Sequence, residues 1–525
     1  MCLFNKHMKP IVRIKKIKGK EYWYEDTPYY DPEKKQIRHK SRYLGKNING
    51  IPVKVRTEGA PGIAAVPTEA HTHGNLLPLQ DIIRELRIDE YLAGLTHEQE
   101  QETILALACN RIIRPLALHQ VATWYEESSL VLTHPDLPLS SQSISELLAR
   151  LGTSGVPEKF MECLLRNLGT DSTLIYDITS LSSSSQFISL LEYGYNRDGL
   201  DLPQVNLSLI LDTVQAIPVM YDLYPGSIVD VVTLKNTLHR VRSLGVKDYT
   251  LVLDRGFFSQ GNLEELLEEE LSFVIPASLT LKAVKEVLTA AQRDLASPQY
   301  LQKYQDDPIF VKPIALQVRG REVTGFCYYD LQREQDERNL FYIRLHDTKQ
   351  KLESVRIPRW RKPEEVFRER AGHLANYFTW ERQDDRLRIE IRNNAVAQRV
   401  NRMGKQIILV RGSLDWEECL TIYRERDAVE KVFRAMKTDL QVMPLQVRTE
   451  ATLKGYLFIT FISLILRMRL LKRMKDAGLL KHYTLEGMLL ELAKIKRIRL
   501  ANGEVITTEI SKRQRTILEA LGLCA

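Results

Sequence analysis

The sequence has few cysteines, and none of them is spaced for a structural role. Six cysteines are spread over 525 residues, with no pair separated by two residues and no grouping with histidine. Zinc sites and disulfide frameworks depend on such spacings. We therefore expect neither, and we expect a protein of a reducing cytoplasm.

Long apolar segments are also missing. The most apolar run, residues 455–466, is bounded by Lys454 and Arg467. It is shorter than the roughly 20 residues that cross a bilayer, so we expect a buried core helix. The first residues show no apolar core of a signal peptide. These features predict a protein with no membrane association.

The charge is small overall but unevenly placed. The net charge is +7, yet residues 1–50 carry 13 Lys and Arg against 5 Asp and Glu, and residues 467–525 carry 13 against 6. The intervening residues are therefore net acidic. Basic ends around an acidic body suggest a polyanion bound at the periphery and metal at the centre. Solvated basic tails are an equally open interpretation.

Composition and periodicity divide the chain before its central part. Residues 1–58 alternate apolar, aromatic and basic side chains around Gly19, which predicts a basic β-hairpin unit that contacts DNA or packs on the body. A linker rich in Gly, Pro and Ala follows at 59–67. Residues 68–170 have the spacing of helices and predict a helical domain, either DNA-binding or a scaffold.

Two segments with the sequence pattern of a strand each end at an aspartate. Residues 171–180 predict a strand that ends at Asp177, and residues 248–258 predict another that ends at Asp254. Taken singly, each aspartate also suits a turn or a cap. Other acidic residues have plainer roles: Asp212 and Asp222 fall in strands, and Asp230 suits a helix N-cap.

The elements around these aspartates follow a known order. Strands are predicted over 204–212, 216–224 and 273–276, with a helix over 231–244. The order strand, strand, strand, helix, strand, helix, strand is that of a ribonuclease-H-like core. Residues 171–279 would form its first part.

The remaining sequence completes this α/β core after a long interruption. Residues 280–405 mix helix with strands, including 340–345 and 386–392, and exceed any ordinary connection, so they predict an inserted, partly β subdomain. Residues 406–475 would return to the core through a strand at 406–411. Residues 476–525 would form a basic C-terminal tail.

One helical face in this second part collects unlike charges. In residues 421–437, Tyr423, Arg426, Glu430 and Lys437 fall within about 60° of one another on a single helix. A carboxylate among cations suits a site that holds a metal ion and grips phosphates. Glu430 could instead only pair with Arg426 or Arg434 along the helix.

These four residues have the Y-x2-R-x3-E-x6-K spacing of transposases in the insertion-sequence-four superfamily, which use a three-carboxylate (DDE) site. The AspArgGlyPhe run at 254–257 resembles the same superfamily, and the likeness spans about residues 170–465. Large, partly β insertions occur in that superfamily between the last core strand and the helix of the third carboxylate.

The resemblance implies roles for particular residues. Asp177, Asp254 and Glu430 would hold two Mg²⁺ (or Mn²⁺) ions, with Asp177 bridging them. Phosphates of the DNA would meet Arg426 and Lys437, and the Tyr423 hydroxyl would lie near the scissile end.

Arg255, beside Asp254, is a candidate DNA contact or an ion-pair partner of an acidic neighbour. Trp360 and Trp380, in the insertion, could stack on an unpaired base, although packing is the favoured role for both.

The implied activity is cleavage at transposon ends and strand transfer into target DNA. Partners would be double-stranded DNA (the terminal inverted repeats and the target) and a second copy of the chain, as a homodimer in the synaptic complex. The setting would be the prokaryotic cytoplasm, at the nucleoid. Alternatives are a ribonuclease-H-like nuclease without strand transfer and a catalytically inactive, transposase-derived DNA-binding protein. A phosphatase that forms an aspartyl phosphate at Asp177 would need an Asp-x-Asp pair, and the sequence lacks one there.

Overall fold

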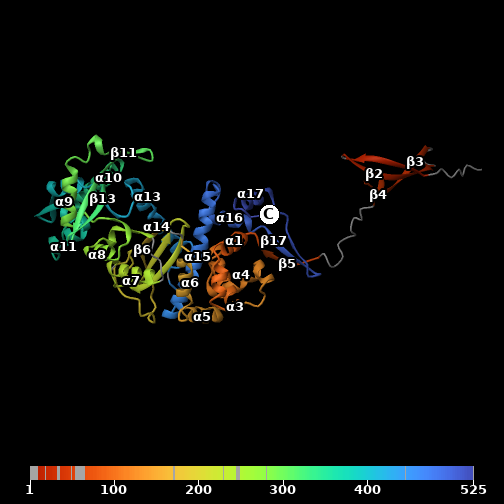
Figure 1. Cartoon of the computed structure of the whole chain (residues 1–525), viewed down its shortest axis with the longest axis horizontal. Coiled ribbons are helices and arrows are strands. Elements are labelled where there is room, and N and C mark those ends of the chain that lie inside the picture. The colour runs from red at the N-terminus through yellow and green to blue at the C-terminus, as the bar shows by residue number, and fades with distance from the viewer. Residues whose placement is uncertain are drawn as a thin grey trace, which may run out of the picture. The chain divides into compact units, whose positions relative to one another are not determined.

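The computed structural model describes residues 10–17, 19–31, 36–48, 50–53, 66–168, 172–228, 230–243, 249–279, 281–443 and 445–523 (Figure 1). The chain forms two compact units. One contains Met1–Ala70 with Arg497–Thr508, and the other contains His71–Lys496 with Glu509–Ala525. Most of the expected linker, residues 59–65, lies outside the described residues.

The first unit consists of small antiparallel sheets. Its N-terminal sheet runs in the order β1 (Ile11–Ile17), β2 (Lys20–Asp31), β3 (Gln36–Ile48), β4 (Ile51–Val53). The expected hairpin of residues 1–58 is therefore a four-stranded sheet. A second sheet joins β5 (Pro67–Thr72), β17 (Lys496–Leu500) and β18 (Val505–Thr507).

Helices of the second unit surround one long apolar helix, α15 (Glu450–Asp476). By length and composition α15 could cross a membrane, but 78% of its most apolar window is buried inside the protein. It packs against α1, α3, α5 and β8, and thereby joins the helical region to the central sheet. The run 455–466 is a core helix, as predicted. The helices of residues 68–170 are α1 (Leu77–Glu85), α2 (Ile88–Ala93), α3 (Glu98–Ile113), α4 (Val121–Glu127), α5 (Ser141–Leu151) and α6 (Val156–Arg166).

The central sheet contains the predicted ribonuclease-H-like order. Its first five strands lie side by side as β8, β7, β6, β9, β10. β6 pairs antiparallel with β7 and parallel with β9, and β10 is parallel to β9. Buried apolar side chains fill these strands, and α7 and α8 follow β8 and β9 in the chain. The elements are β6 (Ser172–Ser182), β7 (Gln204–Asp212), β8 (Ile217–Pro225), α7 (Asp230–Ser243), β9 (Tyr249–Leu253), α8 (Gln260–Glu268) and β10 (Ser272–Pro276).

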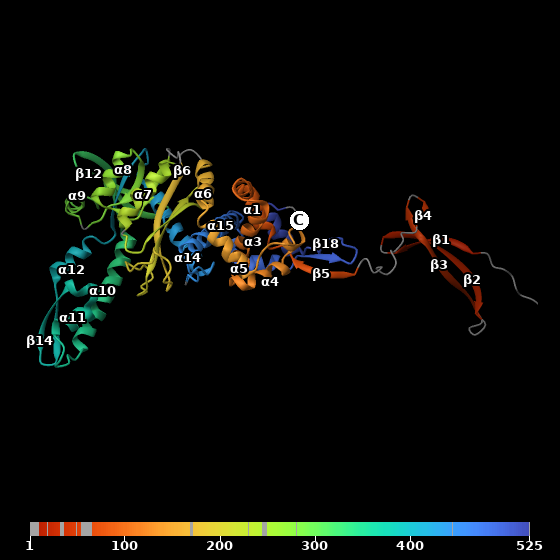
Figure 2. The ribbon, with the colours of Figure 1, turned by 90° about the horizontal axis from the view of Figure 1, so that it is seen from below.

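The insertion is divided between the sheet and a separate cluster. Its first strands extend the central sheet beyond β10 through β16, β13, β12 and β11, so they do not form a separate subdomain. The later elements pack around their own apolar cluster, which includes Phe341, Leu352 and Leu387. Figure 2 shows these elements projecting from one end of the sheet. The elements are α9 (Lys282–Gln292), β11 (Leu301–Tyr304), β12 (Asp307–Val318), β13 (Arg321–Asp330), α10 (Leu331–Ser354), α11 (Pro363–Ala371), β14 (Phe378–Gln383), β15 (Arg386–Ile391), α12 (Asn393–Val400) and β16 (Lys405–Arg411).

Two segments away from the three carboxylates differ from their sequence predictions. The strand predicted at 340–345 is wrong, because those residues lie inside α10, whose surface carries ion pairs one helical turn apart, such as Arg333–Glu337. The strand predicted at 386–392 is present as β15. Residues 476–525, expected as a tail, instead fold into α16 (Leu485–Leu492), β17, β18 and α17 (Lys512–Ala520).

Candidate active site

Asp177 and Asp254 are brought together by the register of two parallel strands. The pairing of β6 with β9 ends at Tyr176 opposite Leu253. The next residue on each strand is one of the two aspartates, so both carboxylates lie where β9 stops. Asp254 follows its strand as predicted.

The prediction that the first strand ends at Asp177 is wrong, because β6 continues to Ser182 along β7. Thr179, Ser180 and Ser182 resemble a loop in sequence, yet they are buried. The Ser182 hydroxyl accepts a hydrogen bond from Asn196 Nδ2 (2.9 Å), and the Ser180 hydroxyl donates to Asn206 Oδ1 (3.4 Å).

The third carboxylate comes from a pair of helices. The single helix predicted for 421–437 is instead α13 (Trp416–Glu425) and α14 (Asp427–Thr438), with Arg426 at the junction. Arg426 keeps helical torsion angles, but the amide of Val429 bonds to its carbonyl three residues back, which tightens the turn. Glu430 lies in the first turn of α14, and Tyr423 lies on α13.

Six of the seven predicted site residues line one pocket of about 610 Å³. They are the three carboxylates with Tyr423, Arg255 and Arg426. Sequence reasoning missed three further cations on its wall and an exposed tyrosine, because they come from a loop and from the starts of α10 and β16 and follow no local pattern. These additional residues are Tyr195, Arg197, Arg333 and Lys405.

Arg426 is the electrostatic centre of this pocket. Its guanidinium pairs with Asp254 and donates from Nη2 to Glu430 Oε1 (3.0 Å), while it lies over the ring of Tyr423. Burial alone would lower the pKa of Arg426, but Tyr423 and the carboxylates outweigh it and raise that pKa. The ion pair between Arg426 and Glu430, four residues apart along the helix, is therefore present, as the sequence allowed. The arrangement places one cation between two of the predicted metal ligands.

Asp177 is poorly compensated by comparison. Burial, followed by the nearby charge of Asp254, raises the pKa of Asp177 to about 7, although the amide of Ile178 (2.8 Å) and the charges of Arg197 and Arg426 oppose this rise. A carboxylate that is costly to ionise in the free protein gains from any cation placed beside it.

Comparison with known families identifies the central part of the chain. A family model described as the transposase DDE domain matches residues 169–466, more than half of the sequence. The chain belongs to the DDE transposase family. The matched region begins just before β6 and ends within α15, and it contains all three carboxylates of the pocket.

Other comparisons are more distant. No curated protein matches the chain. A cryo-EM structure of a piggyBac transposase synaptic complex with hairpin DNA aligns with 81% of this chain and 82% of its own, at 11% identity and a TM-score of 0.38. A Drosophila P element transposase strand transfer complex aligns with 76% and 87%, at 13% identity and a TM-score of 0.21. Neither likeness assigns a role to a residue of this transposase.

The pocket of the DDE domain suits hard divalent ions by donor chemistry. Three carboxylates supply the oxygen ligands that Mg²⁺ and Mn²⁺ prefer. In the part of the chain that the structure describes, no three Asp, Glu, His or Cys side chains are grouped closely enough to hold an ion. Glu430 and Asp254 are instead engaged by Arg426, each through one of its two carboxylate oxygens.

Lys437 does not line the pocket. Its ammonium group bonds to both carboxylate oxygens of Asp198 (2.8 and 2.7 Å), and its side chain is only 14% exposed.

The two tryptophans of the insertion differ from each other in their exposure. Trp380 packs against Phe367, with ring centroids 5.8 Å apart, as favoured from the sequence. Trp360 is 85% exposed, so packing is wrong for that residue.

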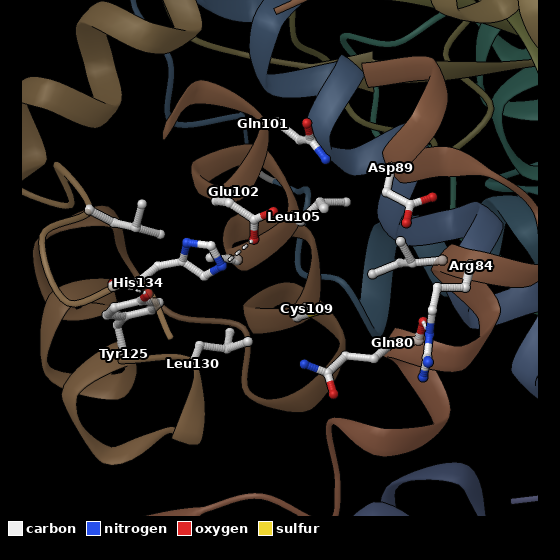
Figure 3. A pocket seen from close by; sticks show the side chains of 13 residues that line it. Gln80, Arg84, Asp89, Gln101, Glu102, Leu105, Cys109, Tyr125, Leu130 and His134 are labelled. Atoms are coloured by element: carbon white, nitrogen blue, oxygen red, sulfur yellow. Dashed lines mark hydrogen bonds and ion pairs between the residues drawn. The ribbon is translucent and has the colours of Figure 1, made fainter. Parts of the chain in front are cut away.

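A second pocket of about 400 Å³ lies between α1, α3 and α4 of the helical region (Figure 3). Its floor is apolar, with Leu105 and Cys109, and Glu102 faces His134 at 3.5 Å on its wall. None of the DDE carboxylates lines it.

Proposed function

We propose that this protein is a transposase of the insertion-sequence-four superfamily. It would cut DNA at the ends of a mobile element and join the freed 3′-hydroxyl to target DNA, with two Mg²⁺ or Mn²⁺ ions. The observation that carries the proposal is the pocket itself. Within a domain of the DDE family, Asp177, Asp254 and Glu430 converge on one cavity whose remaining wall is rich in cations.

Each group of side chains has a task in this reaction. The three carboxylates would hold the ions, which supply an activated oxygen nucleophile and stabilise the leaving oxygen. Arg255, Arg333 and Lys405 would neutralise and orient the phosphates of the entering strand. The Tyr423 hydroxyl would hydrogen-bond near the scissile phosphate, and Arg426 would turn from the carboxylates towards the DNA.

The proposed partners follow from the reaction. Two element ends must be held together, so we propose a homodimer on the terminal inverted repeats, acting at the nucleoid in a prokaryotic cytoplasm.

The test is a cleavage and joining assay with Mg²⁺ and DNA that carries the inverted repeats flanking the gene. Cleaved ends joined to a target plasmid are expected. Cleavage without joining would favour a nuclease, and neither product would indicate an inactive DNA-binding protein.

Metal affinity should depend on pH through Asp177. Its pKa is raised to about 7, so below that pH a proton must leave before a cation can bind. We expect the affinity for Mn²⁺ to fall about fivefold between pH 7 and pH 6, and to change much less between pH 8 and pH 9. Calorimetric titration of the DNA-free protein measures this. Asp177→Asn should bind weakly with a flattened pH profile, and equal wild-type affinity at pH 6 and pH 8 would contradict the assignment.

The N-terminal sheet is proposed to add affinity for DNA backbone. Alternation along the sequence predicts that its cations share one face, but strand register separates them. Residues directly opposite in antiparallel strands share a face. Arg13 lies opposite Tyr24, and Tyr24 opposite Tyr43, whereas Lys40 and Arg42, at alternating positions in β3, lie on the other face. Only one of these faces can rest on a duplex at a time.

Salt dependence identifies which face binds. Removing one cation that pairs with a phosphate should reduce the slope of log affinity against log salt by about 0.9. One double variant, Arg13→Ala with Lys15→Ala, alters the first face, and the other, Lys40→Ala with Arg42→Ala, alters the second. We expect one of them to flatten the slope by about 2, and deletion of residues 1–50 to flatten it at least as much. Superimposable slopes for all four proteins would remove this sheet from the DNA interface.

A further inference from the structure

The loop between β6 and β7, residues 183–203, carries an exposed aromatic side chain into the active-site pocket. Tyr195 lines the pocket and is 82% exposed. Arg197, two residues later, lines the same pocket, and its charge acts on Asp177. An aromatic face beside a cation at the mouth of a DNA-cutting site matches the chemistry of a nucleotide, with its flat base and charged phosphate.

This loop is held in place although its aromatic side chain is exposed. The Asn196 side chain donates to Ser182 Oγ (2.9 Å) and accepts from the amides of Asp198 (2.9 Å) and Leu200 (3.3 Å). The carbonyl of Tyr195 accepts from Gln204 Nε2 (2.9 Å). The backbone that presents the ring is therefore fixed to β6 and β7 on both sides.

A close backbone approach adds to this order. Gly194 lies against the carbonyl of Gly226, and a Cβ at residue 194 would come closer than 3.0 Å to that oxygen. A side chain at this position would push the loop away from the end of β8. The glycine thus fixes the position from which Tyr195 enters the pocket.

Lys437 of α14 also holds this loop. It reaches from α14 to both oxygens of Asp198, three residues after Tyr195, and its own side chain is nearly buried. A cation engaged in this way lies outside the pocket wall. The position of Lys437 therefore suits an anchor of the loop better than a contact with a DNA phosphate.

We infer that Tyr195 is a stacking platform for a nucleobase of the DNA strand entering the active site, and that Lys437 is a positioning residue that holds this platform through Asp198. The inference rests on the proposed function and names the residue that receives the strand. Stacking on an aromatic ring tolerates any base, so it suits an end nucleotide of any sequence.

The first test places 2-aminopurine at the terminal nucleotides of the end DNA and follows its fluorescence and the cleavage rate. Stacking on a ring quenches this base. Quenching on binding is expected for wild type and Tyr195→Phe, and its loss is expected for Tyr195→Ala, with cleavage about tenfold slower.

Tyr193→Ala is the matched control, because Tyr193 is 67% exposed in the same loop but does not line the pocket. The Tyr193→Ala variant should quench 2-aminopurine fluorescence and cleave DNA as wild type does. Unchanged quenching by Tyr195→Ala at every labelled position, in a protein that cleaves normally, would overturn the platform. Absence of cleavage by wild type would instead count against the proposed function.

The second test separates anchoring from phosphate binding. Lys437→Met and Asp198→Asn should each slow cleavage and reduce quenching by a similar factor, and the double variant should be no worse than either. Neither should change the salt slope of DNA binding. If Lys437 instead contacts a phosphate, Lys437→Met would flatten that slope by about 0.9, and Asp198→Asn would leave cleavage intact. That outcome would overturn the anchoring role.

Discussion

Asp177→Ala, Asp254→Ala and Glu430→Ala should each reduce strand cleavage by about 1000-fold or more, while binding of end DNA stays within a few fold of wild type. Removing one ligand of a catalytic ion costs several kcal/mol of transition-state stabilisation, and each 1.36 kcal/mol corresponds to a factor of ten in rate. Affinity for DNA rests on the surrounding cations, which these substitutions leave in place. Single-turnover cleavage and a parallel binding titration measure the two effects separately.

Asp427→Ala is the control for these variants. Asp427 begins the helix that carries Glu430, but its side chain is 69% exposed and does not line the pocket. Its substitution should leave the cleavage rate within a few fold of wild type. Near-normal cleavage by any of the three carboxylate variants would remove that residue from the site.

Gly455→Leu should severely destabilise the second unit. A Cβ at Gly455 of α15 would lie closer than 3.0 Å to the carbonyl oxygen of Leu148 in α5, so the two helix backbones would have to separate. Overpacking of a core costs about 1–3 kcal/mol for added methylenes, and a backbone clash places this variant at or above the upper end. We expect a fall in Tm of several degrees or loss of soluble protein.

Gly261→Ala is the matched comparison. Gly261 is also a helical glycine, in α8, but a Cβ there meets nothing within 4 Å. Alanine should therefore be neutral or stabilising by up to about 1 kcal/mol, since it is the better helix former. Equal thermal stability of Gly455→Leu and wild type would show that α15 and α5 do not pack as described.

The parts of the site that could be predicted from sequence are those set by local patterns. Buried strands are apolar runs, so the order of β6 to β10 and the position of Asp254 after β9 were recoverable. The end of β6 was not, because Thr179, Ser180 and Ser182 resemble a loop until their partners in β7 are known. The spacing of Glu430 from Arg426 also survives the helix junction, since Arg426 keeps helical torsion angles.

The rest depends on contacts between distant segments. Helical periodicity places Lys437 on the face of Glu430, but its partner Asp198 is 239 residues away in sequence. Arg333 and Lys405 reach the pocket only because α10 and β16, which are far apart in the sequence, both begin beside it. No local pattern in the sequence identifies Tyr195 as a site residue. It stands out only in the structure, because its side chain is exposed on a loop that hydrogen bonds hold in place.

The most direct test of the central claim exchanges a metal ligand for a softer one. Cysteine sulfur binds Mg²⁺ poorly and Mn²⁺ better, whereas a carboxylate accepts both. Asp254→Cys should be inactive in cleavage with Mg²⁺ and regain measurable activity with Mn²⁺, while Asp254→Ala should stay inactive with either ion. Recovery confined to the cysteine variant would show that residue 254 touches the catalytic metal. Equal activity of the cysteine and alanine variants in both ions would contradict the account.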